Sequence, residues 1–189
     1  MNNQVLPLTE LFVEPGREVI VLGGGCFWCI EAIFNQMIGV VSAESGYSGG
    51  WVEHPTYEQV CDKKTGHAEV VKVVFDPLVI TLDEILEIFF EIHDPTTLDR
   101  QGNDIGPQYR SAIFYRDERH KSAGEAAILR LQEVHNNKIV TELTPFSNFY
   151  QAELYHQGYY FQHTNQPYCS SVITPKIRKF QKKFSDKLK

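Results

Sequence analysis

The chain has 189 residues, of which 42% are hydrophobic and 22% are charged, and its formal net charge is −6. These values are typical of one globular domain with a full hydrophobic core. The acidic balance argues against nonspecific binding of nucleic acid, and no apolar stretch is long enough to cross a membrane.

The first half of the sequence alternates strand and helix patterns. Residues 1–16 are expected to form an irregular N-terminal extension, and residues 17–189 a single domain. Within that domain the hydrophobic periodicity predicts, in chain order, a strand at 17–22, a helix at 27–38, a strand at 40–47, a loop with a short helix at 51–66 and a strand at 68–75.

The second half continues this alternation. Thr81 and Glu84 form a capping box that opens a helix ending near His93. There follow a long loop at 96–108, a strand at 109–115, a helix at 118–134, a strand at 139–143 and an aromatic-rich, then basic, C-terminal segment. The order βαββαβ predicts an α/β (α+β) fold: a ferredoxin-like plait with a mixed sheet covered by helices, and an irregular C-terminal segment.

A glycine-rich turn, Gly23-Gly24-Gly25, separates the first strand from the first helix and leads directly into Cys26. Free backbone N–H groups and the positive end of the helix dipole at this place favour a thiolate, the nucleophilic form of cysteine. Phe27 and Trp28 come next, so the sulfur is expected beside an apolar surface. We interpret Cys26 as a reactive cysteine that attacks a small apolar compound with a soft or oxidised centre, rather than as a buried structural thiol.

Cys26 and Cys29 also form a C-x-x-C pair, a spacing shared by thioredoxin-like redox pairs and by half of a zinc site. A second C-x-x-C is absent and no histidine stands at a ligand spacing, so a structural zinc is disfavoured. The glycines do not form a dinucleotide fingerprint, because Trp28 stands where a third small residue is needed. The sequence therefore predicts neither a metal site nor a cofactor.

Glu69 lies on the same side of its predicted strand as Val71 and Val73. An acid on an apolar face is costly unless it is protonated, paired or at the rim of a pocket. Burial would raise its pKa and make it a proton donor near neutral pH. The alternative is that Glu69 begins the strand and faces water, and the pattern does not decide between the two.

The other cysteines differ in their settings. Cys169 lies in the C-terminal segment, from which it could reach an oxidised Cys26 and close a disulfide. Cys61 has no comparable setting and is interpreted as an inert thiol.

The start of the sequence carries no secretory signal, so we expect a cytoplasmic location. The aromatic residues at 146–161 are interpreted as core packing.

A series of motifs occurs in order over most of the chain: Gly25-Cys26-Phe27-Trp28, Gly46-Tyr47-Ser48-Gly49-Gly50, Pro55-Thr56-Tyr57, Gly66-His67-Ala68-Glu69-Val70, His93-Asp94-Pro95, and Gln101-Gly102-Asn103-Asp104 with Gln108-Tyr109-Arg110-Ser111. Together they closely resemble the peptide methionine sulfoxide reductase A family. The resemblance implies a repair enzyme that reduces the S-epimer of methionine sulfoxide, in oxidised proteins and as the free amino acid, without a cofactor. Its fold is similar to the plait expected above.

The resemblance also implies roles for individual residues. Cys26 matches the nucleophile that attacks the sulfoxide sulfur and becomes a sulfenic acid, and Glu69 matches the acid that protonates the sulfoxide oxygen. The remaining matches are Phe27 and Trp28 for the pocket around the ε-methyl group, Tyr57 and Tyr109 for hydroxyls that bind and polarise the oxygen, and Asp104 for a loop acid that supports the site.

The recycling step is where this chain departs from many relatives, which carry Gly at the position of Cys29 and two cysteines in a glycine-rich tail. Here the tail is short and basic, and it follows a single Cys169. Cys169 matches the usual resolving position, so the resemblance favours a Cys26–Cys169 disulfide. A Cys26–Cys29 disulfide or a relay through both stays open. A thioredoxin-type dithiol is the implied reductant.

One competing function uses the same cysteines. A thiol–disulfide oxidoreductase built on Cys26 and Cys29 would not need Glu69, but the predicted order of elements is not thioredoxin-like. We expect neither nucleic acid nor membrane as a partner. We expect a monomer, because the sequence shows no obvious exposed apolar patch.

Overall fold

This computed structural model describes residues 5–6, 13–136 and 138–189 of the chain. The expected N-terminal extension falls largely outside them. Its described part includes β1 (Val5–Leu6), which pairs antiparallel with β9 (Phe149–Gln151). The domain boundary after residue 16 stays a prediction.

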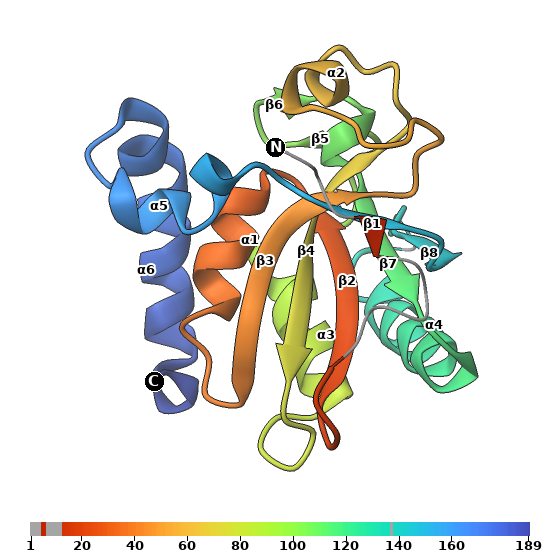
Figure 1. The fold of residues 1–189 in the computed structure, drawn as a ribbon. Helices are drawn as coiled ribbons and strands as arrows, with labels where there is room; N and C mark the ends of the chain where they lie inside the picture. The colour runs from red at the N-terminus through yellow and green to blue at the C-terminus, as the bar shows by residue number, and fades with distance from the viewer. Residues whose placement is uncertain (1–4, 7–12, 137) are drawn as a thin grey trace.

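The described strands form a seven-stranded sheet in the order β1-β9-β3-β4-β2-β7-β8, with β5 and β6 in a separate ladder (Figure 1). Its centre consists of β2 (Glu18–Gly24), β3 (Val40–Ser48), β4 (Ala68–Phe75) and β7 (Ser111–Tyr115). Neighbours among these strands are antiparallel, and the connecting segments carry α1 (Phe27–Phe34) and α3 (Leu82–Ile92). This order confirms the ferredoxin-like plait, and β8 (Glu142–Pro145), which runs parallel to β7, makes the sheet mixed.

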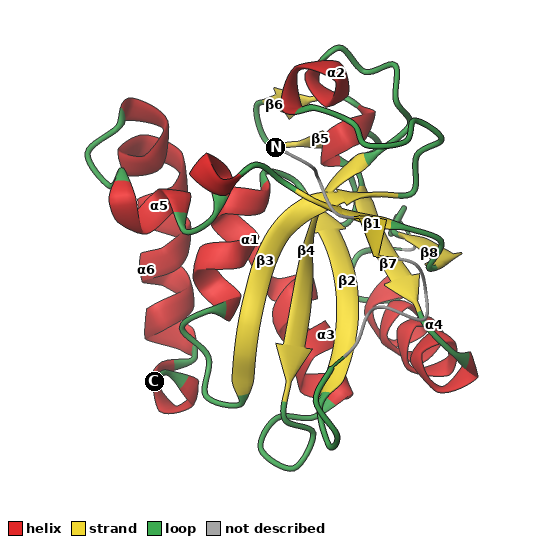
Figure 2. Cartoon of the chain, in the orientation of Figure 1, coloured by secondary structure: helices red, strands yellow, loops and turns green. Residues whose placement is uncertain are grey.

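Both faces of the central sheet are buried. Ile20 and Leu22 on β2 belong to the core cluster that includes the apolar residues of α1 and α3 (Figure 2). Val19 and Val21 alternate with them and join a second cluster on the other face, with Phe114. The strand is therefore apolar throughout, because neither of its faces meets water.

Most predicted helices and strands are present, with shifted ends. The capping box is confirmed: the Glu84 N–H donates to Thr81 Oγ1 at 3.2 Å, and the Thr81 N–H donates to Glu84 Oε2 at 2.9 Å. The first helix ends at Phe34 rather than residue 38, where the Asn35 side chain exchanges two hydrogen bonds with the backbone of Ala43. The helix predicted at 118–134 is α4 (Glu118–Gln132), and the strand predicted at 139–143 lies further along, at β8.

The C-terminal segment is more regular than the sequence predicted. It contains the 3-10 helices Leu154–His156 and Ser185–Lys187, α5 (Tyr159–Gln162), a π-helix at Cys169–Ile173 and α6 (Thr174–Lys183). Ile177 and Phe180 of α6 are buried in the core cluster beside α1 (Figure 1). These two apolar residues recur at helical spacing among lysines, and that spacing is the signal that compositional reasoning overlooked.

Several short elements gather at the end of the sheet where β2 leads into α1 (Figure 1). They are α2 (Tyr57–Cys61), β5 (Arg100–Gln101), β6 (Asp104–Ile105) and the 3-10 helix Pro107–Tyr109. None of the helices in the described part of the chain combines the length and the apolarity that crossing a bilayer requires.

Candidate active site

Cys26 stands at the junction of β2 and α1, as the N-cap residue of the helix. The turn before it requires a glycine. Gly25 has a φ of +95°, and a Cβ added there would lie 2.6 Å from Cγ of Gln101. The tight turn leaves the Cys26 thiol half-buried at the start of α1.

A cavity of about 150 Å³ opens beside this thiol. It is lined by Cys26, Phe27, Trp28, Tyr57, Glu69, Asp104, Tyr109 and Tyr168. Every residue that the sequence analysis placed in a catalytic or substrate-binding role therefore lines one pocket, although these residues come from β4, α2, β6 and the start of α1. Cys29 and Cys169 are not among the lining residues, and Tyr168 was not predicted.

Glu69 is buried on β4, with only 1% of its surface exposed. The solvent-facing interpretation of this residue is therefore wrong. Burial raises its pKa to about 8, and the negative charge of Asp104 acts in the same direction. The backbone N–H of Phe27 opposes them by donating to Glu69 Oε2 at 3.1 Å. The carboxyl group is thus largely protonated at neutral pH while it stays within reach of the start of α1.

The Cys26 thiol responds to the same environment. Burial raises its pKa well above the ordinary value, and a charged Glu69 raises it further. A hydrogen bond from the Trp28 backbone, as expected at a helix start, lowers it, as does one from the Tyr168 hydroxyl. The predicted stabilisation of a thiolate is therefore present but outweighed by desolvation. Protonation of Glu69 removes one of the opposing effects.

Three tyrosine hydroxyls face the pocket. Burial, and next the charge of Glu69, raise the pKa of Tyr57 and of Tyr109, so both remain hydrogen-bond donors. The Tyr168 hydroxyl donates to Asp104 Oδ2 at 2.6 Å. Its position directly before Cys169 was the one sequence signal that could have drawn attention to it.

Contacts with neighbouring aromatic side chains hold the Trp28 ring in place. Its ring stacks on Tyr159, with ring centroids 3.8 Å apart and an interplanar angle of 11°. Its indole N–H donates to Nδ1 of His156 at 3.0 Å, and His156 is itself 1% exposed. The predicted core packing at 146–161 therefore includes residues that shape the pocket.

Glu153 was missed as well. Its Oε1 accepts the backbone N–H of Tyr57 at 2.9 Å, and its Oε2 accepts the Tyr47 hydroxyl at 2.8 Å. These bonds tie α2 to β3 and hold Tyr57 at the edge of the pocket. No residue pattern within 146–161 indicates this role, because both partners lie about a hundred residues earlier in the chain.

All four cysteines are free thiols. Cys29 is 6% exposed, and its backbone N–H donates to the Cys26 carbonyl at 3.2 Å. Cys169 is fully buried at the start of the π-helix. Cys61 is half-buried and hydrogen-bonded to the Tyr57 hydroxyl, and its interpretation as an inert thiol stays a prediction.

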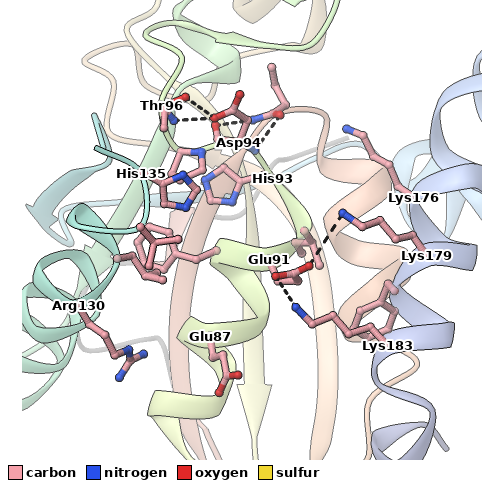
Figure 3. Close-up of a pocket in the computed structure, with 17 residues that line it drawn as sticks. Glu87, Glu91, His93, Asp94, Thr96, Arg130, His135, Lys176, Lys179 and Lys183 are labelled. Carbon is pink, nitrogen blue, oxygen red and sulfur yellow. Dashed lines mark hydrogen bonds and ion pairs between the residues drawn. The ribbon is translucent and has the colours of Figure 1, made fainter. Parts of the chain in front are cut away.

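A second and larger cavity, of about 910 Å³, forms a groove between α3, α4 and α6 (Figure 3). Exposed charged side chains line its walls, and Glu91 pairs with Lys183 at 2.7 Å and with Lys179 at 4.0 Å. None of the predicted catalytic residues lines this groove. Within the described residues, no group of three or more His, Cys, Asp or Glu side chains is arranged to hold a metal ion.

Comparisons with known proteins agree with this geometry. The family described as peptide methionine sulfoxide reductase matches residues 18–188. The peptide methionine sulfoxide reductase MsrA of Sulfolobus acidocaldarius is 59% identical over 170 residues, which cover 90% of this chain and 97% of that protein.

Solved structures give the same result. The reduced form of Mxr1 from Saccharomyces cerevisiae superimposes with a TM-score of 0.77 at 35% identity, covering 84% of this chain and 92% of that one. Mxr1 in complex with Trx2 matches with a TM-score of 0.55 at 30% identity, covering 78% and 88%.

The chain therefore belongs to the peptide methionine sulfoxide reductase family. It reduces the S-epimer of methionine sulfoxide to methionine, the repair reaction of MsrA enzymes. The competing interpretation, a thiol–disulfide oxidoreductase, is not favoured.

Proposed function

We propose that this member of the peptide methionine sulfoxide reductase family carries out its reaction in the pocket at the start of α1, with Cys26 as nucleophile and Glu69 as acid. The observation that carries the proposal is a carboxyl group, 1% exposed, in the same small pocket as a half-buried thiol. With a pKa raised by burial to about 8, Glu69 holds a proton at neutral pH. Sulfoxide reduction needs a soft nucleophile for sulfur and a proton for oxygen, and this pair supplies both.

In the first step the Cys26 sulfur attacks the sulfoxide sulfur while the sulfoxide oxygen takes the proton of Glu69. The oxygen then passes to the Cys26 sulfur, and both the new bond between the two sulfurs and the sulfur–oxygen bond of the substrate break. Two electrons move from Cys26 to the substrate, so the products are methionine and a Cys26 sulfenic acid. The proton of the Cys26 thiol passes to Glu69, which regains its acid form, and no further reactant is consumed.

The remaining lining residues position the substrate. Phe27 and Trp28 form an apolar slot for the ε-methyl group, which cannot accept the hydrogen bonds that an oxygen accepts. The hydroxyls of Tyr57 and Tyr109 bind and polarise the sulfoxide oxygen. Asp104 supports the site through the 2.6 Å hydrogen bond that it accepts from Tyr168.

A second thiol must then remove the sulfenic acid. We propose that a thiol of this chain, Cys169 at the usual family position or Cys29, supplies it in a reaction that forms a disulfide and releases water. A thioredoxin-type dithiol reduces that disulfide. The match to Mxr1 in complex with Trx2 supports this partner.

The pocket volume of about 150 Å³ suits one side chain, so we propose that it accepts both protein-bound and free methionine sulfoxide. A dithiol reductant and four free cysteines fit a reducing compartment, which we propose is the cytoplasm, with the enzyme acting as a monomer.

A single-turnover reaction tests the chemistry. Each epimer of an N-acetylated methionine sulfoxide amide is mixed with an excess of the reduced enzyme, without an external reductant. We expect stoichiometric methionine from the S-epimer and none from the R-epimer, and Cys26→Ser should form none from either. Methionine formation by Cys26→Ser would refute the assignment of the nucleophile.

A further inference from the structure

Cys29 stands one helical turn after Cys26. Cys26 is the N-cap of α1 and Cys29 occupies the third helical position. The Cys29 N–H donates to the Cys26 carbonyl at 3.2 Å, and a C-x-x-C spacing is the one that thioredoxin-like redox pairs use. Cys29 is also among the groups whose negative charge would raise the pKa of Cys26, as expected for two neighbouring thiols.

Cys169 is less favourably placed for a first attack. The neighbouring Tyr168 already hydrogen-bonds to Cys26. Successive residues of a helical segment point about 100° apart, so the Cys169 side chain leaves this segment in another direction. It is 0% exposed and packed in the core cluster.

The backbone around Cys169 is held in place on both sides. Its carbonyl accepts the Thr174 hydroxyl at 3.0 Å, and the Ser170 N–H donates to the Gln166 carbonyl at 2.9 Å. These bonds hold the Cys169 backbone in place, whereas Cys29 lies within one turn of Cys26 on a single helix.

We propose that Cys29 resolves the Cys26 sulfenic acid first, ahead of Cys169. The Cys29 sulfur attacks the Cys26 sulfur, the sulfur–oxygen bond breaks, and the oxygen leaves as water after taking up the thiol proton. The sulfenic acid is reduced and the Cys29 thiol is oxidised, so a Cys26–Cys29 disulfide forms with no other reactant. Close placement offsets the small thiolate fraction of a buried thiol.

The inference rests on the proposed role of Cys26, and one experiment separates the two. Reduced enzyme is mixed with a limiting amount of the S-sulfoxide, and methionine, remaining thiols and dimedone-reactive sulfenic acid are followed with time. Methionine formation reports the proposed function, whereas the loss of two thiols per turnover reports the resolving step.

Three variants give the decision. Cys169→Ala should lose two thiols as fast as the wild type. Cys29→Ala should still form methionine from the S-sulfoxide, but its sulfenic acid should persist at least tenfold longer than that of the wild type. Ile33→Val, a small change at another buried residue of α1, controls for packing. Prompt loss of two thiols by Cys29→Ala would overturn the proposal, and a failure of all variants to form methionine would instead refute the proposed function.

The disulfide itself can be located. Chymotrypsin cleaves after Phe27 and Trp28, between the two cysteines, so the resulting peptides stay linked only if Cys26 is bonded to Cys29. Cleavage after Tyr57 places Cys61 on a separate peptide. We expect linked Cys26 and Cys29 peptides early in the wild-type reaction, and an early peptide joining Cys26 to Cys169 would contradict the proposed order.

Discussion

Two concave regions of this molecule differ in size and in what surrounds their charges. The groove between α3, α4 and α6 has a volume of about 910 Å³, and the pocket beside Cys26 has about 150 Å³. The groove holds solvent-exposed ion pairs such as Glu91 with Lys183. The pocket holds a carboxyl group that burial keeps largely uncharged. Exclusion of water, rather than size, distinguishes the proposed active site from the groove.

The difference follows from desolvation. A carboxylate in water beside a lysine keeps its proton affinity low and contributes little to stability. The carboxyl group of Glu69 is buried on β4 and accepts one N–H donor at 3.1 Å. Because a buried charge is costly, this group binds a proton more tightly. That proton is what the departing sulfoxide oxygen requires.

The largest expected effect comes from the pocket thiol. Cys26→Ser replaces a soft nucleophile with a hydroxyl that the pocket does not ionise, so kcat/KM for the S-epimer should fall by at least about a thousandfold. Steady-state assays with a thioredoxin-type reductant measure it. If kcat/KM fell by less than tenfold, the Cys26 thiol would not be the nucleophile, and the pocket would not differ from the groove in this respect.

Glu69→Gln should lower kcat/KM by about a hundredfold or more, because it removes the proton donor but keeps an acceptor for the Phe27 N–H. In the wild type, activity should decline as pH rises through about 8, where Glu69 loses its proton, and the variant should lack that decline. An unchanged pH profile in the variant would assign the titration to another group.

The same substitution should increase stability at alkaline pH. The folded pKa of about 8 lies above the unfolded value of about 4.3. The contribution of Glu69 to stability is therefore fully present below about pH 4 and lost as pH rises through 8. Above pH 8, Glu69→Gln should be more stable than the wild type by a few kcal/mol at most, as denaturant unfolding would measure. Equal stability of the two proteins at pH 5 and pH 9 would contradict the burial argument.

Trp28→Ala should have a smaller effect, because it opens the apolar slot without touching the reacting atoms. Loss of the stacking on Tyr159 and of the hydrogen bond to His156 leaves the ε-methyl group partly in water. We expect kcat/KM to fall by about 10- to 200-fold, mostly through KM. Trp28→Phe, which keeps an aromatic ring, should recover part of the loss.

The smallest effect is expected in the groove. Lys183→Met removes the 2.7 Å ion pair with Glu91, and both side chains are partly exposed. Activity should stay within about twofold, and the free energy of unfolding should change by less than about 1 kcal/mol. A large loss of activity would show that the groove takes part in the reaction, and the contrast drawn above would fail.

Much of the fold was readable from the sequence because its signals are local. The alternation in Ala68–Phe75 and the capping box at Thr81 each depend on a few neighbouring residues, and both are confirmed. The short strand β8 and the C-terminal end of α1 were placed less well, since the pairing of β8 with β7 and the Asn35 side-chain bonds to Ala43 accompany them. Helix α6 was missed because its buried apolar residues are few and lie between charged ones.

The same distinction between local and tertiary signals applies to the candidate site. The sequence placed Cys26 at a helix start and put Glu69 on the apolar side of a strand, since turn chemistry and strand period act over a few residues. It left the burial of Glu69 undecided and missed Tyr168, Glu153 and His156. Those depend on which segments meet, and only the closed sheet brings them to one pocket. Burial is a property of that closed structure. It raises the pKa of Glu69 and of Cys26, and it leaves Cys169 with no exposed surface.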